Sequence, residues 1–389
     1  SATATVTVDI SPPVITFTDP TEGQVTDNVT YLENASGWDK GTAMPWAVHS
    51  PAGASLNGRM YSFGGYDTAP LNNVASYDPQ TDTWETHAPM PTDRYGAAAA
   101  ALNGKLYVLG GFGSGGYTGA LEEYDPASDT WTTRAANPVA RYYLGLVALD
   151  NKLYAVGGYR YGSSSSATRV DVYSPLTDTW TQLANLPTGR RGLAVCVHNG
   201  LIYAIGGSSS TGVNEVYNPS SNSWSTLAPM PVTRVYMGGG VIDGKIYITG
   251  GYDSSYKQNS YSYDIASDTW TEMPEYYDTS LSYYACDVID NSLYYVGSYP
   301  NDLPGDQNVR YTPSDFFGGD AWTGGAALTF TRTSGHAAAQ FGNKFYLFGG
   351  LSMPTGNETE SYSPATNSWT RLADKPTAHK GYFLGAAEV

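Results

Sequence analysis

Short apolar runs alternate with polar turns over most of the chain. In one clear unit, the small apolar run 96–102 is followed by Asn103-Gly104 and by a second run, 105–111 (KLYVLGG). Asn-Gly favours a type I′ hairpin because both central residues of that turn take positive φ. After a variable loop come a third run and a polar turn, and Trp131 then begins a fourth run. The unit predicts a four-stranded antiparallel sheet.

This unit recurs along the chain with a period of roughly 44–52 residues, which is typical of sheets repeated around an axis. Each clear copy has a glycine pair at the end of its second run and a tyrosine seven residues before a tryptophan. The six regular tyrosine–tryptophan pairs are Tyr77–Trp84, Tyr124–Trp131, Tyr173–Trp180, Tyr217–Trp224, Tyr263–Trp270 and Tyr362–Trp369. A further copy is irregular: we expect Trp322 to close it after Tyr311, and Gly297-Ser298 replaces its glycine pair.

The glycine pair, the spaced tyrosine and tryptophan, and a Pro-x-x-Arg lead-in to the next copy resemble the kelch repeat. The resemblance covers roughly residues 30–389. It implies an all-β propeller of four-stranded blades whose loops bind a ligand. Kelch propellers serve as protein-interaction modules, as sugar-handling enzymes and as parts of extracellular proteins, so the family alone does not select a function.

The ends of the chain favour eight blades over seven. Tyr31 and Trp38 keep the seven-residue spacing, Val14–Asp19 lies where a second strand is expected, and Ala2–Asp9 and Gly381–Val389 both have the pattern of innermost strands. We expect residues 379–389 to pair beside Val14–Asp19, so that the two termini close the ring and remove exposed sheet edges. In the alternative, seven blades close alone and residues 1–45 form a separate edge or linker.

Closure by the C-terminus would leave residues 1–12 as an arm outside a propeller formed by residues 13–389. Ala2–Asp9 alternates small or β-branched apolar residues with threonine and carries no charge before Asp9. A strand of this kind is a template for pairing with another chain. One hypothesis is therefore head-to-tail self-association into a filament. The alternative is that the strand completes its own blade or is the remnant of a preceding domain.

Candidate binding residues gather at the lead-ins to the inner strands and in the loops between second and third strands, which should open on the same face. Four of the five lead-in arginines follow a proline by three residues, and several have an aromatic neighbour. The candidate binding set is Arg94, Arg141, Tyr142, Tyr159, Arg190, Arg234, Tyr236, Tyr252 and Arg332. Arginine donors beside tyrosine rings suit a carboxylate, an acidic peptide or a sugar. In the structural alternative, the arginines bind loop carbonyl groups.

Composition narrows the class of protein. The net charge of -16 disfavours binding to nucleic acid or to an anionic membrane surface, and no apolar run approaches the ~20 residues of a membrane span. Only 14% of residues are charged, which favours an extracellular or cell-surface location. The two cysteines, Cys196 and Cys286, are expected to be free thiols.

No catalytic, metal or cofactor pattern stands out, because the five histidines show no paired spacing and no cysteine–histidine set is present. The sequence therefore favours a secreted or surface kelch propeller that acts as a non-enzymatic binding or structural module for a protein or carbohydrate ligand. The alternative is an extracellular carbohydrate-active enzyme, similar to a mutarotase or an oxidase, that uses the arginine- and tyrosine-rich face.

Overall fold

The computed structural model describes residues 6–9, 14–17, 38–160, 167–207, 212–273, 281–299, 305–313, 336–341, 344–349, 359–363 and 368–371. The chain divides into two compact units, Ser1–Thr312 and Pro313–Val389. Within the described residues all regular structure is β-strand.

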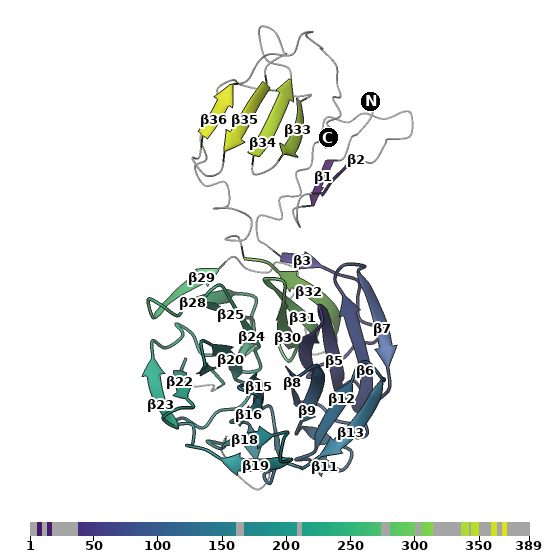
Figure 1. Ribbon diagram of the computed structural model, residues 1–389, viewed down its shortest axis with the longest axis vertical. Helices are drawn as coiled ribbons and strands as arrows, with labels where there is room; N and C mark the ends of the chain where they lie inside the picture. The colour runs from purple at the N-terminus through teal and green to yellow at the C-terminus, as the bar shows by residue number, and fades with distance from the viewer. Residues whose placement is uncertain are drawn as a thin grey trace. The chain divides into compact units, whose positions relative to one another are not determined.

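Six four-stranded antiparallel sheets form a ring in the first unit, and each sheet is called a blade (Figure 1). The first blade is β4 (Ala52–Leu56), β5 (Arg59–Tyr66), β6 (Pro70–Asp78) and β7 (Thr83–His87). The second is β8 (Ala98–Leu102), β9 (Lys105–Leu109), β12 (Leu121–Asp125) and β13 (Thr130–Arg134). The third is β15 (Gly145–Leu149), β16 (Lys152–Val156), β18 (Val170–Ser174) and β19 (Thr179–Gln182).

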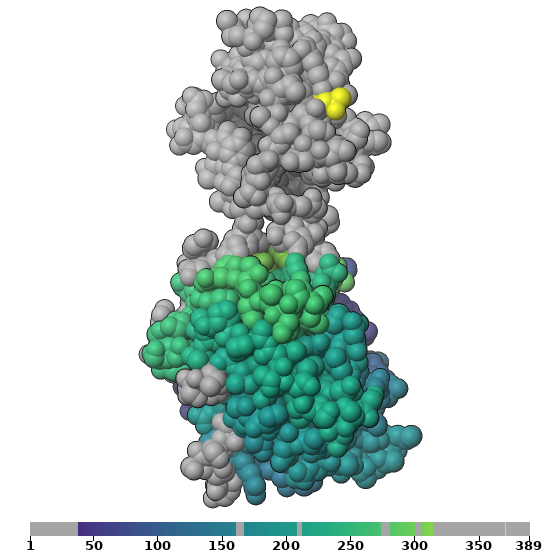
Figure 2. Space-filling view, turned by 90° about the vertical axis from the view of Figure 1, so that its left-hand side faces the viewer, coloured from purple at the N-terminus to yellow at the C-terminus, as the bar shows by residue number. Residues whose placement is uncertain are grey.

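The fourth blade is β20 (Ala194–His198), β21 (Leu201–Ile205), β22 (Asn214–Asn218) and β23 (Ser223–Leu227). The fifth is β24 (Gly239–Ile242), β25 (Lys245–Thr249), β28 (Ser260–Asp264) and β29 (Thr269–Met273). The sixth is β30 (Ala285–Ile289), β31 (Ser292–Ser298), β32 (Gly305–Tyr311) and, from far upstream in the chain, β3 (Trp38–Lys40). Consecutive blades lie side by side, as the gradual colour change in the side view of Figure 2 shows.

Local sequence explains the shape of each blade. The hairpins between first and second strands have positive φ at both central residues, for example 52° at Asn103 and 75° at Gly104, as predicted for type I′ turns. The glycines after the second strand also take positive φ, and a Cβ on Gly110 would lie 2.5 Å from the carbonyl oxygen of Arg141. The first glycine of the pair is therefore required where the lead-in to the next blade crosses the sheet, and the sixth blade keeps it as Gly297.

A circle of backbone hydrogen bonds closes the ring at its axis. In each blade one residue before the inner strand takes a left-handed conformation, with φ between 52° and 61°. Its N–H group donates to the carbonyl group of the equivalent residue in the preceding blade, at distances between 2.5 and 3.0 Å. We call these six residues the axial annulus: Ser50, Gly96, Tyr143, Gly192, Tyr236 and Tyr283. Because Ser50 donates to Tyr283, the sixth blade adjoins the first.

At the rim, a recurring latch joins neighbouring blades. The Trp131 indole N–H donates to the carbonyl oxygen of Ala88 at 2.9 Å. Asp129 accepts hydrogen bonds from the N–H group of the same Ala88 (2.9 Å) and from the Tyr124 hydroxyl (2.6 Å). The same pattern recurs in the first, third, fourth and fifth blades with Trp84, Trp180, Trp224 and Trp270. The tyrosine–tryptophan spacing thus reflects a contact between blades, with the tryptophan at the blade boundary.

The prediction of eight blades is wrong, since the annulus closes with six. The prediction that Trp322 closes the copy after Tyr311 is also wrong, because β3 pairs with β32 and places Trp38 opposite Tyr311. The register is the same as that of Tyr77 and Trp84 in the first blade. Trp322 itself lies outside the described residues.

Strands toward the two ends of the chain form two further sheets that do not belong to the six blades. Strands β1 (Val6–Asp9) and β2 (Val14–Phe17) form a two-stranded hairpin, so that Val14–Phe17 pairs with the N-terminal strand. The predicted partner, residues 379–389, lies outside the described residues. In the second unit, β33 (His336–Phe341), β34 (Lys344–Gly349), β35 (Thr359–Ser363) and β36 (Ser368–Arg371) form one four-stranded sheet with the blade register, including Tyr362 opposite Trp369.

Candidate binding face

The lead-in segments and the loops between second and third strands lie together at one end of the ring, as predicted. Short bridges join them in four blades: His49 pairs with Tyr66, Tyr95 with Phe112 and Val235 with Tyr252. In the third blade, β14 (Arg141–Tyr142) pairs with β17 (Tyr159–Arg160). The axial annulus belongs to the same lead-in segments, so this end of the ring carries all the candidate residues that the structure describes.

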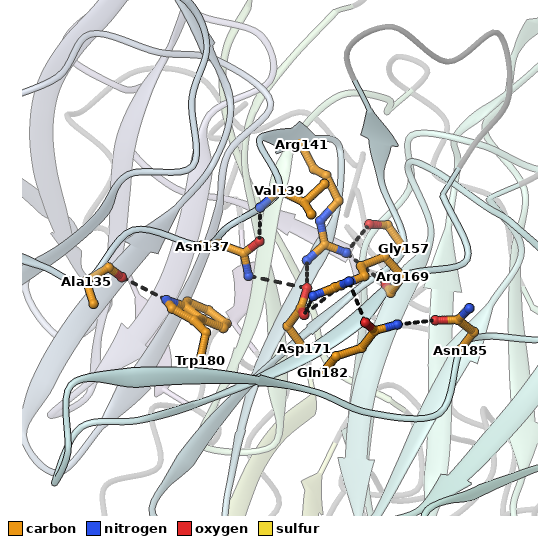
Figure 3. A network of polar contacts seen from close by, with 10 residues as sticks. All are labelled: Ala135, Asn137, Val139, Arg141, Gly157, Arg169, Asp171, Trp180, Gln182 and Asn185. Atoms are coloured by element: carbon orange, nitrogen blue, oxygen red, sulfur yellow. Dashed lines mark hydrogen bonds and ion pairs between the residues drawn. The ribbon is translucent and has the colours of Figure 1, made fainter.

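Arg141 is buried in the third blade, and both of its terminal nitrogens bind groups of that blade (Figure 3). Its Nη1 donates to the carbonyl oxygens of Gly157 (2.9 Å) and Arg169 (2.8 Å), and its Nη2 donates to the Asp171 carboxylate (2.7 Å). Asp171 also accepts hydrogen bonds from Arg169 and Asn137. Burial lowers the pKa of Arg141 to about 10, against the opposing charge of Asp171, so the side chain is still a cation at neutral pH.

Arg94 and Arg190 repeat this arrangement in the second and fourth blades. Arg94 pairs with Glu122 at 2.5 Å, and Arg190 pairs with Glu215 at 2.7 Å. Both guanidinium groups also donate to carbonyl oxygens of their own blade, such as Ala120 and Val213. These contacts match the structural alternative of the sequence analysis, extended by a buried carboxylate that it did not foresee. A ligand-binding role for Arg94, Arg141 and Arg190 stays a prediction.

Arg234 has different surroundings in the fifth blade. Its Nη1 donates to the carbonyl oxygen of Thr233 (3.0 Å), and its Nη2 donates to the Asn259 side-chain oxygen (2.6 Å). Within the part of the chain that the structure describes, no carboxylate forms an ion pair with it. Arg332, the fifth predicted arginine, lies outside the described residues.

Aromatic side chains form one connected group over this end of the ring, which we call the tyrosine surface. All of its members are partly exposed, and each has a ring within 6.5 Å of another member's ring. The members are His49, Tyr66, Tyr95, Phe112, Tyr117, Tyr142, Tyr143, Tyr159, Tyr236, Tyr252, Tyr256, Tyr283 and Tyr299. The group contains the four tyrosines of the predicted binding set: Tyr142, Tyr159, Tyr236 and Tyr252.

Residues of the axial annulus form the centre of the tyrosine surface. The rings of Tyr236 and Tyr283 stack with centroids 4.0 Å apart, and Tyr143 lies 4.8 Å from Tyr236. The Ser50 hydroxyl is 3.1 Å from the Tyr143 hydroxyl and 3.0 Å from Nδ1 of His49. The two glycines of the annulus make room for these rings, because a Cβ on Gly192 would lie 2.7 Å from the Tyr236 ring.

The tyrosine surface is uncharged at neutral pH. Burial lowers the pKa of His49 to about 4, so its imidazole is neutral. Burial raises the pKa of Tyr142 to about 12 and raises the pKa of Tyr143 and Tyr283 further, so their hydroxyl groups stay protonated. At the edge, the Arg191 guanidinium lies 4.9 Å from the Tyr159 ring centroid. The surface therefore offers ring faces and neutral hydroxyl groups to a ligand.

The predicted binding set contains four members of the tyrosine surface, and His49, Tyr66 and Tyr283 are among the members that it does not contain. Tyr66 directly follows Gly64-Gly65, as Tyr159 follows Gly157-Gly158, so the glycine pair was an available signal. Tyr283 lies in the copy that lacks Pro-x-x-Arg, and His49 precedes the first clear copy. Both positions become recognisable only in the structure, because Tyr283 belongs to the axial annulus and His49 directly precedes Ser50 of the annulus.

Other site types have no support within the residues that the structure describes. No group of three or more His, Cys, Asp and Glu side chains could hold a metal ion there. The two cysteines are free thiols, as predicted. A search of the described residues for a helix long and apolar enough to span a membrane found none.

Comparisons with known families agree with this architecture. Residues 57–233 match the model of the KLHDC2/KLHL20/DRC7 Kelch-repeats domain. Residues 233–275 and 332–376 match the model of the Kelch motif. The two models together span most of the ring and the separate sheet of the second unit. A search of curated proteins found no match.

Proposed function

Because the chain belongs to the kelch-repeat β-propeller family, we propose that it is a binding module that holds a protein ligand on the tyrosine surface. Propellers of this family vary in their ligands, so the location of the site has to come from this chain's own residues. The supporting observation is the connected group of partly exposed aromatic rings around the axis.

Aromatic rings of this kind supply large contact areas at low entropic cost, since a tyrosine side chain has only two rotatable χ angles. Tyrosine is also enriched among the residues that contribute most to binding free energy at protein interfaces. The hydroxyl group of Tyr142 stays protonated at neutral pH, so it can donate a hydrogen bond to a peptide carbonyl group. A ligand would thus gain apolar contact without having to desolvate a charged group at the centre.

The same rings would accept a sugar, which stacks its apolar face on an aromatic ring. A carbohydrate ligand, as expected from the sequence, is therefore the competing outcome of the test. The extracellular or cell-surface location and self-association through residues 1–12 also stay predictions. The binding experiment depends on neither of them.

The proposal is tested by selecting a random-sequence peptide library against the immobilised chain and, in parallel, by screening an array of defined oligosaccharides. The double variant Tyr142→Ser/Tyr159→Ser removes two aromatic rings of the tyrosine surface whose centroids lie 5.5 Å apart. Since hot-spot residues contribute about 2 kcal/mol or more each, selected peptides should lose at least roughly thirtyfold in affinity for this variant.

Leu176→Ser is the matched control, because Leu176 is a large apolar side chain with 95% of its surface exposed in the turn between β18 and β19. It should leave peptide affinity unchanged. Selected peptides that bind the double variant as tightly as the unmodified chain would contradict the proposal. Binding of oligosaccharides alone, lost in the double variant, would assign the surface to a carbohydrate instead.

A further inference from the structure

The fifth blade has lost a carboxylate that the three preceding blades have in common. In those blades the second residue of the third strand is Glu122, Asp171 or Glu215, and each pairs with the lead-in arginine. The equivalent residue of β28 is Tyr261, because Tyr261 lies opposite Ile248 as Glu215 lies opposite Ala204. Arg234 keeps its lead-in position without that partner.

The Arg234 side chain is only 4% exposed, yet most of its hydrogen-bonding capacity is unused among the described residues. A guanidinium group has five N–H donors in a planar fork. Thr233 and Asn259 each accept one hydrogen bond from Arg234, and its Nε has no partner, as is also true of Arg94 and Arg141. By contrast, Arg190 donates five hydrogen bonds. A buried cation without a neutralising partner is costly, and its pKa is lowered by that burial.

An open groove of about 540 Å³ leads to Arg234. Besides Arg234, the residues that line it are Val232, Asp253, Ser255, Tyr256, Lys257, Gln258 and Asn259. Glu272, the other acid near Arg234, accepts hydrogen bonds from Asn259 and Tyr261 and forms no ion pair with the guanidinium. The groove thus has two cations and several neutral donors against one lining carboxylate.

The groove is continuous with the tyrosine surface through Tyr256, which lines it. The Tyr256 ring lies 5.3 Å from the Tyr252 ring and 6.0 Å from the Tyr299 ring. A ligand on the tyrosine surface can therefore extend a side chain or a chain end into the groove. Because the net charge of the chain is -16, long-range attraction would not bring an anion here, and binding has to depend on the local guanidinium.

We propose that Arg234 binds a carboxylate group of the ligand, which takes the place that Glu122, Asp171 and Glu215 occupy in the second, third and fourth blades. The ligand class is a protein or peptide that presents an acidic side chain or its C-terminus. A carboxylate matches the planar fork of arginine and can accept two parallel hydrogen bonds from it. This inference rests on the proposed function for its protein ligand, but the site itself can be tested with a small carboxylate.

The test uses sodium acetate as the probe, with sodium chloride at equal ionic strength as the reference. Melting temperature is measured during titration at neutral pH for the unmodified chain and for two variants. Arg234→Gln removes the cation. Asn259→Asp is nearly isosteric and places a carboxylate at the oxygen that Arg234 already contacts at 2.6 Å.

Acetate should raise the melting temperature of the unmodified chain relative to chloride, because a ligand that binds only the folded state stabilises it. Both variants should lose at least tenfold in apparent acetate affinity. The Tyr142→Ser/Tyr159→Ser variant should keep the acetate response, which separates this site from failure of the tyrosine surface. No response in the unmodified chain, or an equal response in Arg234→Gln, would overturn the proposal. If Asn259→Asp does not fold, Arg234→Gln alone decides.

Discussion

The third and fifth blades each have an arginine at the lead-in position, but the two arginines have different partners. In the third blade, Arg141 binds two carbonyl oxygens and the buried Asp171, so the side chain joins three segments of one blade. In the fifth blade, Arg234 lies at the end of a groove and has no carboxylate partner among the described residues. The comparison shows how a repeated structural residue becomes available for binding when one partner is replaced.

Breaking the arginine–carboxylate pair of the third blade should have the largest effect on stability. Asp171→Ala would leave Arg141 buried without its anion, and removing one partner of a buried pair costs about 3–5 kcal/mol. Urea unfolding followed by tyrosine and tryptophan fluorescence measures the loss. A decrease in the free energy of unfolding below about 1 kcal/mol would show that the pair does not hold the blade together.

The rim latch should contribute less and should be independent of the arginines. Asp129→Ala removes the acceptor of two hydrogen bonds, from Tyr124 and from the Ala88 backbone, so it should cost about 2 kcal/mol. Asp129→Asn is the matched control, because Asn222 fills the same role in the fourth blade with hydrogen bonds from Tyr217 and Ala184. An equal loss in both variants would contradict the assigned contacts.

The rim latch should also make the stability of the protein depend on pH in the acid range. A hydrogen bond from Tyr124 lowers the pKa of Asp129, and one from Tyr173 lowers the pKa of Asp178. Since the folded pKa lies below the unfolded value, this stabilisation is present above the ordinary value of 3.8 and is lost as the pH falls through the folded pKa. Melting temperatures from neutral to acid pH should fall less steeply for Asp129→Asn than for the unmodified chain; parallel curves would exclude a contribution from Asp129.

Much of the blade architecture could be predicted from the sequence because it depends on local residues. Asn103-Gly104 requires one type of turn, and Tyr124 and Trp131 lie opposite each other because the intervening turn fixes their register. The number of blades depends on contacts between distant residues instead. Ser50 bonds to Tyr283, and Trp38 replaces Trp322 opposite Tyr311, and neither pairing follows from a count of repeats.

The candidate site was predictable to a similar extent. Tyr159 and Tyr252 follow glycine pairs and could be assigned to the loop face. The acidic partners Glu122, Asp171 and Glu215 were missed because they lie inside strands, where a carboxylate is unexpected unless a buried cation faces it. Without those partners, the sequence could not distinguish Arg234 from Arg141.

The most direct test of the account compares the same substitution in the two blades. Arg141→Gln and Arg234→Gln remove the same charge from equivalent lead-in positions, and urea unfolding gives the free energy of each variant. We expect Arg141→Gln to lose about 3–5 kcal/mol, because it breaks the buried ion pair with Asp171 and the hydrogen bonds to two backbone carbonyl groups, while Asp171 keeps its ion pair with Arg169. We expect Arg234→Gln to lose no more than about 1 kcal/mol. Equal losses in the two variants would show that Arg234 is as structural as Arg141 and would contradict its assignment to ligand binding.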